Sequence, residues 1–311
     1  MPYFSVIIPL YNKESFIEKT LECVLNQTFK DFEIIIVNDG STDNGLEKIK
    51  KFTDNRIKIF QQENQGVSVA RNKGMEMAEG EYFCFLDADD EWKNDCLENF
   101  YKAIVRFSDY LVFSAAIEIE TEKKTIPAQY ALTNFINDCY FIENFFKAST
   151  KFSIIWTSCA AFHRSVFKLS GNFDPSIKSG QDLDLWIRIG SIYEVVFINK
   201  ILAKYVFDGK SLSRNILYKK SSKIKYSKFK ALEETHPEIK VFLDLNRYSE
   251  IITSKLTGNY DLAKKLKKDV KIKNLTPKKI FLMTCPVFVL KFFIRIQPIL
   301  IKYGLRNTFY K

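Results

Sequence analysis

The sequence contains few of the residues on which several common kinds of functional site depend. Among its 311 residues are only two histidines, His163 and His236, which argues against histidine-based catalysis or metal binding. Its six cysteines form no CxxC pair, a pattern typical of reduced thiols in a cytosolic compartment without a zinc site or a disulfide framework. There is no GxGxxG after the first apolar run and no GxxxxGK[ST], which argues against dinucleotide-binding oxidoreductases and P-loop nucleotide triphosphatases.

Long apolar segments are absent as well. The first residues, MPYFSVIIPLYN, lack the basic stretch and cleavage site of a signal peptide and are typical of a strand. The apolar run Ile280–Leu290 is too short to cross a bilayer, and Lys291 and Arg295 interrupt the next apolar residues. We therefore expect the protein to stay inside the cell.

The net charge of +10 is distributed unevenly along the chain. Residues 1–208 contain 23 Lys and Arg against 30 Asp and Glu, whereas residues 209–311 contain 24 against 7. Such a basic end suits an anionic membrane surface. A nucleic-acid-binding module is the alternative, but it requires a basic groove on the folded domain, and the candidate site of this chain is acidic. We predict no nucleic-acid partner.

Apolar residues make up 46% of the chain, enough for one large α/β domain with an appendage or for two modest domains. In the first third, short apolar runs alternate with helical patterns, and the predicted strands are 4–9, 33–37, 56–60 and 82–86. This alternation predicts a Rossmann-like, mainly parallel sheet flanked by helices. Further along, we predict strands at 110–116, 154–162, 194–199 and 202–207 and helices at 138–148, 164–169 and from 180 onward.

Polar clusters follow three of the predicted strands, at Pro9–Glu14, Asn38–Asp43 and Asp87–Asp90. The carboxyl ends of parallel strands meet at one edge of a sheet, and ligands of open α/β sheets bind there. We therefore expect a single binding crevice at this edge.

The stretch Tyr82–Trp92, YFCFLDADDEW, is the most informative of the three. A buried strand ends there in three carboxylates, and burying uncompensated carboxylates costs several kcal/mol. We expect Asp87 and Asp89 to share a divalent cation. The alternative is a polar loop in which Asp90 caps a helix that starts near Asn94.

A second acidic feature lies in the run GQDLDLWIR. On a helix, Asp182 stands at the head of an apolar stripe, while Asp184 and Arg188 form an i,i+4 pair on the opposite side. A carboxylate in that place is a candidate functional residue. The alternative is a first-turn Asp that interacts favourably with the helix dipole.

Taken in order, these motifs resemble those of bacterial family 2 inverting glycosyltransferases. The resemblance covers roughly residues 3–213 and is carried by SVIIPLYN, EIIIVNDGSTD, NQGVSVARNKG, FLDADD and GQDLDLWIR. It implies a GT-A fold, a UDP-sugar donor, a divalent metal (Mn²⁺ or Mg²⁺) and a single-displacement reaction.

The resemblance also implies roles for residues on the donor side. Pro9, Tyr11 and Glu14 match the loop that packs around the base and ribose of the nucleotide. Asp39 matches the acid that accepts the uracil imide hydrogen. Arg71 matches a basic residue that contacts the donor, although it could equally be a surface arginine of a helix.

The metal and the reaction centre are implied in the same way. Asp87, Ala88 and Asp89 match the DxD motif, whose carboxylates contact the ribose and the metal. Hard oxygen ligands suit Mg²⁺ or Mn²⁺. Asp182 matches the catalytic base, which takes the proton of an acceptor hydroxyl.

Two positions depart from the family pattern. Gln181 replaces a frequent Glu before the base, and Asp208 stands where many members have a His, so it either replaces that His as a metal ligand or belongs to a different loop. On the acceptor side we name Gln181, Trp92 and Trp156. The two tryptophans are candidate sugar-stacking platforms, and the alternative is that they belong to the core.

The domain organisation follows from these patterns. We predict a glycosyltransferase domain at 1–210 and a basic helical region at 211–311, in which 276–311 form a membrane-surface helix with Lys and Arg along one stripe. The alternative is a helix pair packed on the catalytic domain or on a second subunit of a homodimer.

The sequence thus predicts a metal-dependent glycosyltransferase, transferring a hexose or an N-acetylhexosamine to a glycan or lipid-linked acceptor during surface polysaccharide assembly. We expect it to be peripheral on the inner face of the cytoplasmic membrane. A membrane-anchored nucleotide-sugar-binding protein without turnover is the alternative. The particular sugar, acceptor and linkage are not determined by these motifs.

Overall fold

A computed structural model of the chain describes residues 1–132, 138–209 and 224–293. The chain divides into two compact units, one spanning Met1–Gly209 and the other beginning at Lys225. Part of the predicted membrane-surface helix, residues 294–311, lies outside the described residues.

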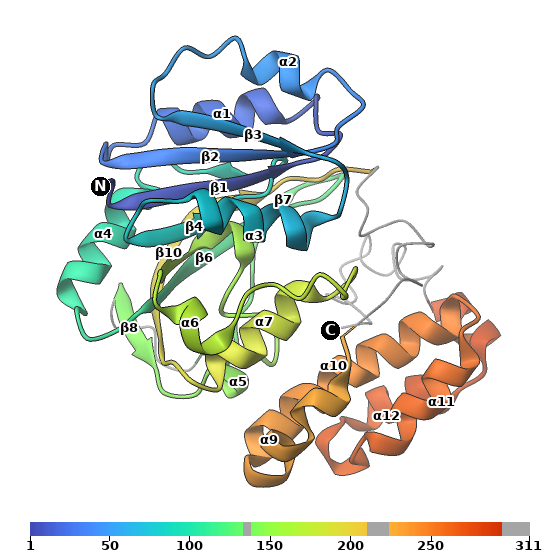
Figure 1. The fold of residues 1–311 in the computed structure, drawn as a ribbon. Coiled ribbons are helices and arrows are strands. Elements are labelled where there is room, and N and C mark those ends of the chain that lie inside the picture. The colour runs from blue at the N-terminus through green and yellow to red at the C-terminus, as the bar shows by residue number, and fades with distance from the viewer. Residues whose placement is uncertain (133–137, 210–223, 294–311) are drawn as a thin grey trace. The chain divides into compact units, whose positions relative to one another are not determined.

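The first unit is built on one sheet, to which ten strands contribute among the described residues (Figure 1). In chain order they are β1 (Phe4–Leu10), β2 (Phe32–Asp39), β3 (Ile57–Gln62), β4 (Tyr82–Phe85), β5 (Glu91–Trp92), β6 (Val112–Glu120), β7 (Thr125–Pro127), β8 (Cys139–Ile142), β9 (Ala160–His163) and β10 (Val195–Tyr205).

The strand order is β3-β2-β1-β4-β9-β6-β10-β5, with β7 paired to β6 and β8 paired to β10. The first four strands are parallel, as predicted, and β6 is parallel to β10. The remaining pairs, which involve β5, β7, β8 and β9, are antiparallel. The predicted α/β class is confirmed, with the parallel pairing concentrated in the half of the sheet where strands and helices alternate.

Helices cover both faces of this sheet. Those of the first unit are α1 (Ile17–Leu25), α2 (Gly45–Ile49), α3 (Val67–Met77), α4 (Cys96–Arg106), α5 (Phe145–Ala148), α6 (Val166–Ser170) and α7 (Gln181–Gly190). Short 3-10 turns occur at η1 (Thr157–Cys159) in this unit, and at η3 (Tyr226–Phe229) and η4 (Ile272–Asn274) in the second.

Strand β1 shows why helices must pack on both faces of the sheet. All seven of its residues are buried, and successive side chains point to opposite faces. Val6 and Ile8 belong to the core that includes apolar residues of α1 and α4, while Ile7 points at Gly74 of α3. In Figure 1, α1 and α3 accordingly lie on opposite sides of the sheet.

Two sequence-based predictions in the middle of the chain are wrong. The helix predicted at 138–148 is instead β8 followed by the single turn α5, because Cys139–Ile142 pairs antiparallel with β10. The strand predicted at 154–162 begins only at Ala160, after the turn η1. In both places a partner strand, and not the local pattern, decides the backbone conformation.

The last predicted strands, 194–199 and 202–207, form one strand. β10 runs from Val195 to Tyr205, with register shifts between Ile198 and Ile201 and between Ile201 and Ala203. Such irregularities bend a strand and re-aim its side chains. The register shifts interrupt the apolar pattern, which is why the sequence predicted two strands in place of one.

The second unit is helical where the structure describes it. Its helices are α9 (Lys230–Thr235), α10 (Pro237–Leu256), α11 (Tyr260–Asp269) and α12 (Pro277–Thr284). Pro237 occupies the first turn of α10, where its missing N–H is harmless, and Asn259 accepts a hydrogen bond from Leu262 N at the start of α11.

Buried ion pairs hold this unit together. Asp244 of α10 is fully buried, and its Oδ1 accepts from Lys240 Nζ at 2.6 Å and from Arg247 at 3.2 Å. Arg247 also forms a fork with Glu233. Within the described residues, no helix is long and apolar enough to cross a membrane.

The contact between α3 and β1 yields a first prediction. A Cβ added at Gly74 would lie 2.3 Å from Ile7 Cγ2, and the stiff, buried Ile7 cannot move aside. Although alanine favours helices by about 1 kcal/mol, we expect Gly74→Ala to lower the free energy of unfolding by about 1–3 kcal/mol. Urea unfolding monitored by circular dichroism measures this loss.

Glu76→Ala, on the exposed side of the same helix, is the matched control and should change stability by less than about 0.5 kcal/mol. Ile7→Ala combined with Gly74→Ala should destabilise less than the sum of the two single changes, because the collision disappears. Simple additivity would show that the close approach is not what requires Gly74.

Candidate active site

The loops that follow β1 and β2 are fastened to each other by polar contacts. Glu14 Oε2 accepts a hydrogen bond from Asn44 N at 2.9 Å, and Glu14 N donates to Asp43 Oδ2 at 2.8 Å. Asn12 Oδ1 accepts from Thr42 N at 2.8 Å. Glu14, predicted to lie beside the donor base, therefore shapes this edge of the sheet by holding the neighbouring loop.

Pro9 and Tyr11 lie at the same edge. Pro9 is buried within β1, opposite Val37 of β2, so its ring packs in the sheet. Tyr11 is half-buried just beyond the end of the strand. Of these two residues, Tyr11 is therefore the one with side-chain surface available to a ligand.

Asp39 at the end of β2 is 2% exposed and ties three protein groups together. Its Oδ1 accepts from Gln62 Nε2 at 2.8 Å and from Gln65 N at 2.9 Å, and its Oδ2 accepts from Gly66 N at 2.8 Å. A carboxylate accepts about four hydrogen bonds, so one position remains for a further donor. Asp39 anchors the start of α3, and the predicted imide contact would have to use this one remaining position.

Arg71 of α3 is the residue on which the candidate site converges. Its guanidinium donates from Nη2 to Asp87 Oδ1 and from Nη1 to Asp182 Oδ1, both at 2.6 Å, and lies 5.1 Å from the ring centroid of Phe173. Arg71 is 2% exposed, so the alternative of a surface arginine is wrong. Burial lowers the pKa of Arg71, but the two carboxylates more than compensate and raise it above its ordinary value.

Lys13 makes a second bridge that the sequence motifs did not identify. Its Nζ lies 2.5 Å from Asp89 Oδ2 and 2.6 Å from Asp208 Oδ2, and all three side chains are largely buried. The contact brings Asp208 to the DxD loop. The one available signal was a cation placed between Tyr11 and Glu14 in a crevice expected to be acidic.

Asp90 does not cap a helix. It is 1% exposed and accepts hydrogen bonds from Ser158 Oγ at 2.5 Å and from Val206 N at 3.2 Å, whereas α4 has Asp95 at its N-cap. Burial raises the pKa of Asp90 well above its ordinary value, and the carboxylates of the DxD motif raise it further. Asp90 therefore braces the loop after β4 against the end of β10.

Asp182 stands in the first turn of α7 and is directed toward Arg71. Gly180 precedes it with φ +84°, a left-handed conformation that turns the chain into the helix. Burial raises the pKa of Asp182; Arg71 lowers it and Asp87 raises it again, leaving a net increase. On the opposite side of α7, Arg188 pairs with the fully buried Asp184, as predicted.

Gln181 and Ala88 contribute less to the accessible surface than predicted. Gln181 is 8% exposed, and its Oε1 has no hydrogen-bond partner among the described residues. The side chain of Ala88 is buried in the core, and its carbonyl accepts from Thr20 Oγ1 at 3.1 Å. Ala88 sets the shape of the DxD loop and offers little side-chain surface to a ligand.

The prediction of Trp92 as a sugar-stacking platform is wrong. Its ring is 3% exposed within the core, and its Nε1 donates to Ser158 O at 2.5 Å. Trp156 is half-buried, stacked on Phe152 at 5.3 Å and edge-on to Tyr205 at 5.5 Å. Of the two tryptophans, Trp156 keeps exposed surface.

Whether a divalent cation suits this site depends on the carboxylates of the DxD loop. Among the described residues, no three acidic, histidine or cysteine side chains converge closely enough to hold a metal ion. Asp87 and Asp89 instead each bind a cationic side chain. Carboxylate oxygens that already bind cationic side chains also suit Mg²⁺ or Mn²⁺, provided that a bound ligand supplies further oxygens.

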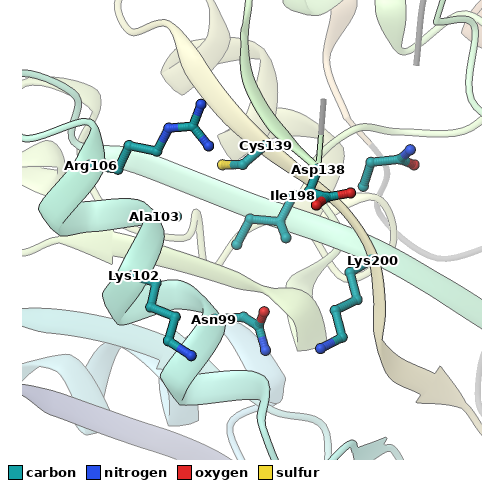
Figure 2. A pocket seen from close by; sticks show the side chains of 9 residues that line it. Asn99, Lys102, Ala103, Arg106, Asp138, Cys139, Ile198 and Lys200 are labelled. Atoms are coloured by element: carbon teal, nitrogen blue, oxygen red, sulfur yellow. The ribbon is translucent and has the colours of Figure 1, made fainter. Parts of the chain in front are cut away.

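A separate cavity of about 360 Å³ lies between α4 and the strands β8 and β10 (Figure 2). Lys102 and Lys200 at this cavity pair with Glu98 and Asp95, so carboxylates already balance their charges. None of the predicted site residues contributes to its lining, which comprises Asn99, Lys102, Ala103, Arg106, Asp138, Cys139, Ile198, Asn199 and Lys200.

Comparison with known families identifies the class of protein. The family model described as Glycosyl transferase family 2 matches residues 5–170, more than half of the chain. The chain is also 31% identical over 244 residues to the putative teichuronic acid biosynthesis glycosyltransferase TuaG of Bacillus subtilis, a match that covers 76% of this chain and 90% of TuaG. The chain belongs to glycosyl transferase family 2.

Other relatives match over shorter stretches. Identity is 39% over 134 residues to the putative glycosyltransferase EpsH of Bacillus subtilis, and 45% over 105 residues to the glycosyltransferase GlyA of Streptococcus pneumoniae. These matches cover 42% and 33% of this chain. The chain spans 39% of the length of EpsH and 15% of the length of GlyA.

The fold is shared with a solved structure. S. aureus TarS 1–349, crystallised in complex with UDP-GlcNAc, superposes with a TM-score of 0.65 and 19% identity, covering 90% of this chain and 87% of that chain. The predicted GT-A fold is therefore confirmed.

The brace made by Asp90 yields the second prediction. Asp90→Ala leaves Val206 N and Ser158 Oγ without a buried acceptor, and we expect the free energy of unfolding to fall by about 2–4 kcal/mol. Asp90→Asn keeps a carbonyl oxygen for Val206 N and should cost clearly less. Chemical denaturation of both variants measures the difference.

Asp95→Ala is the control, because Asp95 pairs with Lys200 at the surface, where such pairs contribute at most about 1 kcal/mol. Equal stability of the Ala and Asn variants of Asp90 would contradict the proposed brace.

Proposed function

We propose that this chain is a metal-dependent, inverting glycosyltransferase that moves a sugar from a UDP-sugar to a glycan or lipid-linked acceptor during cell-surface polysaccharide synthesis. Membership of glycosyl transferase family 2 supports the reaction type. The name of TuaG, and the UDP and UDP-GlcNAc complexes of TarS, support the donor and the biological setting.

The observation that carries this proposal is the bridge through Arg71. It joins Asp87, at the carboxyl end of β4, to Asp182, in the first turn of α7. The bridge fixes a donor-side carboxylate and a candidate base on either side of one guanidinium. Two functional carboxylates in defined positions are what a displacement reaction between a donor and an acceptor needs.

In the proposed mechanism, Asp182 accepts the proton of an acceptor hydroxyl while that oxygen attacks the anomeric carbon from the face opposite the nucleotide. Arg71 orients the Asp182 carboxylate. The increased pKa of Asp182 makes it a stronger base than an ordinary aspartate. A divalent cation held by Asp87 and Asp89 would neutralise charge on the departing diphosphate.

The third prediction concerns Asp182. Asp182→Asn keeps the size of the side chain but removes the base, so we expect UDP release to fall by about a hundred- to ten-thousandfold while UDP binding is retained. A coupled UDP-release assay with a panel of UDP-sugars and simple acceptors, with Mn²⁺ or with EDTA, measures turnover. Calorimetry measures UDP binding.

Asp109→Asn, at an exposed position, is the matched control and should behave like the wild type. Near-normal turnover of Asp182→Asn would remove Asp182 from the mechanism, and full activity in EDTA would remove the metal. A wild-type protein that binds UDP-sugars but releases no UDP with any acceptor would favour the alternative, a nucleotide-sugar-binding protein without turnover.

We further propose that the second unit contacts an anionic membrane surface, at the inner face of the cytoplasmic membrane. Phe281, Phe288 and Phe292 are 51%, 74% and 59% exposed, respectively. Lysines accompany them, both in α11 and around α12. Exposed aromatic side chains beside lysines are suited to the boundary between lipid headgroups and acyl chains. Docking of this surface on a second subunit is the alternative.

The fourth prediction tests this surface. Full burial of a Phe is worth about 1.5–3 kcal/mol, so Phe281→Ser combined with Phe288→Ser should weaken binding to phosphatidylglycerol vesicles by about tenfold or more. Sedimentation of the full chain with vesicles gives the partition coefficient. The control changes Leu169 and Ile192, exposed apolar residues of the first unit, to Ser.

Equal vesicle binding by the two double variants would contradict the membrane proposal. Concentration-dependent dimerisation that only the Phe variants lose, measured by analytical ultracentrifugation, would support the alternative of a second subunit.

A further inference from the structure

Lys13 occupies an unusual place in the candidate site. Its ammonium lies between Asp89 Oδ2 and Asp208 Oδ2, at 2.5 and 2.6 Å. The three side chains are 19%, 15% and 12% exposed, so these contacts are shielded from water. Two carboxylate oxygens that belong to separate loops thus converge on a single positive charge.

The two cations of the site are held in different ways. Arg71 is 2% exposed and is fixed by two carboxylates and the ring of Phe173. Lys13 belongs to the loop that precedes α1, and its charge stands at the end of a flexible four-carbon stem. Lys13 can therefore withdraw without disturbing a helix, whereas Arg71 cannot.

The ring of Phe16 also lies near the ammonium. Lys13 Nζ lies 5.5 Å from the ring centroid of Phe16, within the distance at which an aromatic face attracts a cation. A diphosphate bound at this edge would add negative charge close to the same ammonium. The Lys13 ammonium thus has an attractive neighbour besides the two carboxylates.

We propose that Lys13 is a built-in counter-ion of the site. Its ammonium holds Asp89 and Asp208 together while no donor is bound, and a divalent cation that binds with the donor displaces it from these two carboxylates. The inference rests on the proposed function, because it takes the donor to be a nucleotide diphosphate bound with a metal. It assigns Lys13 and Asp208 to the metal site, with Lys13 as a competitor of the metal.

A specific consequence is that removal of the lysine charge strengthens the binding of a metal cation. Without Lys13, the carboxylates of Asp89 and Asp208 lose the ammonium that they share, a costly change for largely buried groups. A metal ion then has no Lys13 ammonium to displace, and it reduces the repulsion between the two carboxylates. A residue that only supports the fold would not produce this effect.

The test is the binding of Mn²⁺ alone, without UDP, to the full chain, measured by isothermal titration calorimetry. We expect Lys13→Met to bind Mn²⁺ about tenfold or more tightly than the wild type, because the metal no longer has to displace the hydrogen-bonded Lys13 ammonium. Its melting temperature should be lower than that of the wild type without metal, and Mn²⁺ should raise it more.

Lys19→Met is the matched control, because Lys19 also pairs with a carboxylate, Glu91, but lies on the exposed side of α1. It should leave Mn²⁺ affinity unchanged. Lys13→Gln provides a second, polar variant should Lys13→Met not fold. Asp208→Asn introduced into the Lys13→Met chain should abolish the gain in affinity.

Unchanged or weaker Mn²⁺ binding by both folded Lys13 variants would overturn the inference, as would a gain that survives Asp208→Asn. The UDP-release assay of the wild type is independent of this outcome. If the wild type turns over a UDP-sugar only with metal while the Lys13 variants show no gain, the inference fails and the proposed function stands. If the wild type shows neither metal-dependent turnover nor UDP binding, the proposed function itself fails.

Discussion

The buried guanidinium of Arg71 is the interaction on which the rest of the candidate site depends. A charge with 2% exposure is tolerated only where opposite charges surround it, and here these are Asp87 and Asp182. The three residues come from α3, the end of β4 and the start of α7. Their pairing therefore fixes the parallel half of the sheet against the helix α7, and it holds both carboxylates in place.

The other polar contacts of the site also connect separate elements of the fold. Asp39 ties the start of α3 to β2, Asp90 ties the loop after β4 to the end of β10, and Lys13 joins the first loop to Asp208. Each contact crosses between elements, so this edge of the sheet is held by charges and hydrogen bonds where the apolar core ends.

The first half of the fold could be predicted because its signals are local. β1 to β4 and the helices between them each show their own periodicity, and β-branched runs buried on both faces are typical of parallel strands. Residues 138–148 and 154–162 were mispredicted because their conformation depends on pairing with distant strands. Trp92 was misplaced for a related reason, since its position after a strand does not show which way its ring points.

The sequence by itself determined the order of the strand-end clusters, which contain Asp87 and Asp89, and it separately indicated Asp182 at the head of an apolar helix stripe. Only the tertiary structure decided which charges meet. Arg71 and Asp182 are 111 residues apart, and Lys13 and Asp208 are 195 apart, so no local pattern encodes either pair. The hydrophobic periodicity of a segment indicates which of its side chains face the core. A salt bridge instead depends on where the tertiary structure places two separate elements.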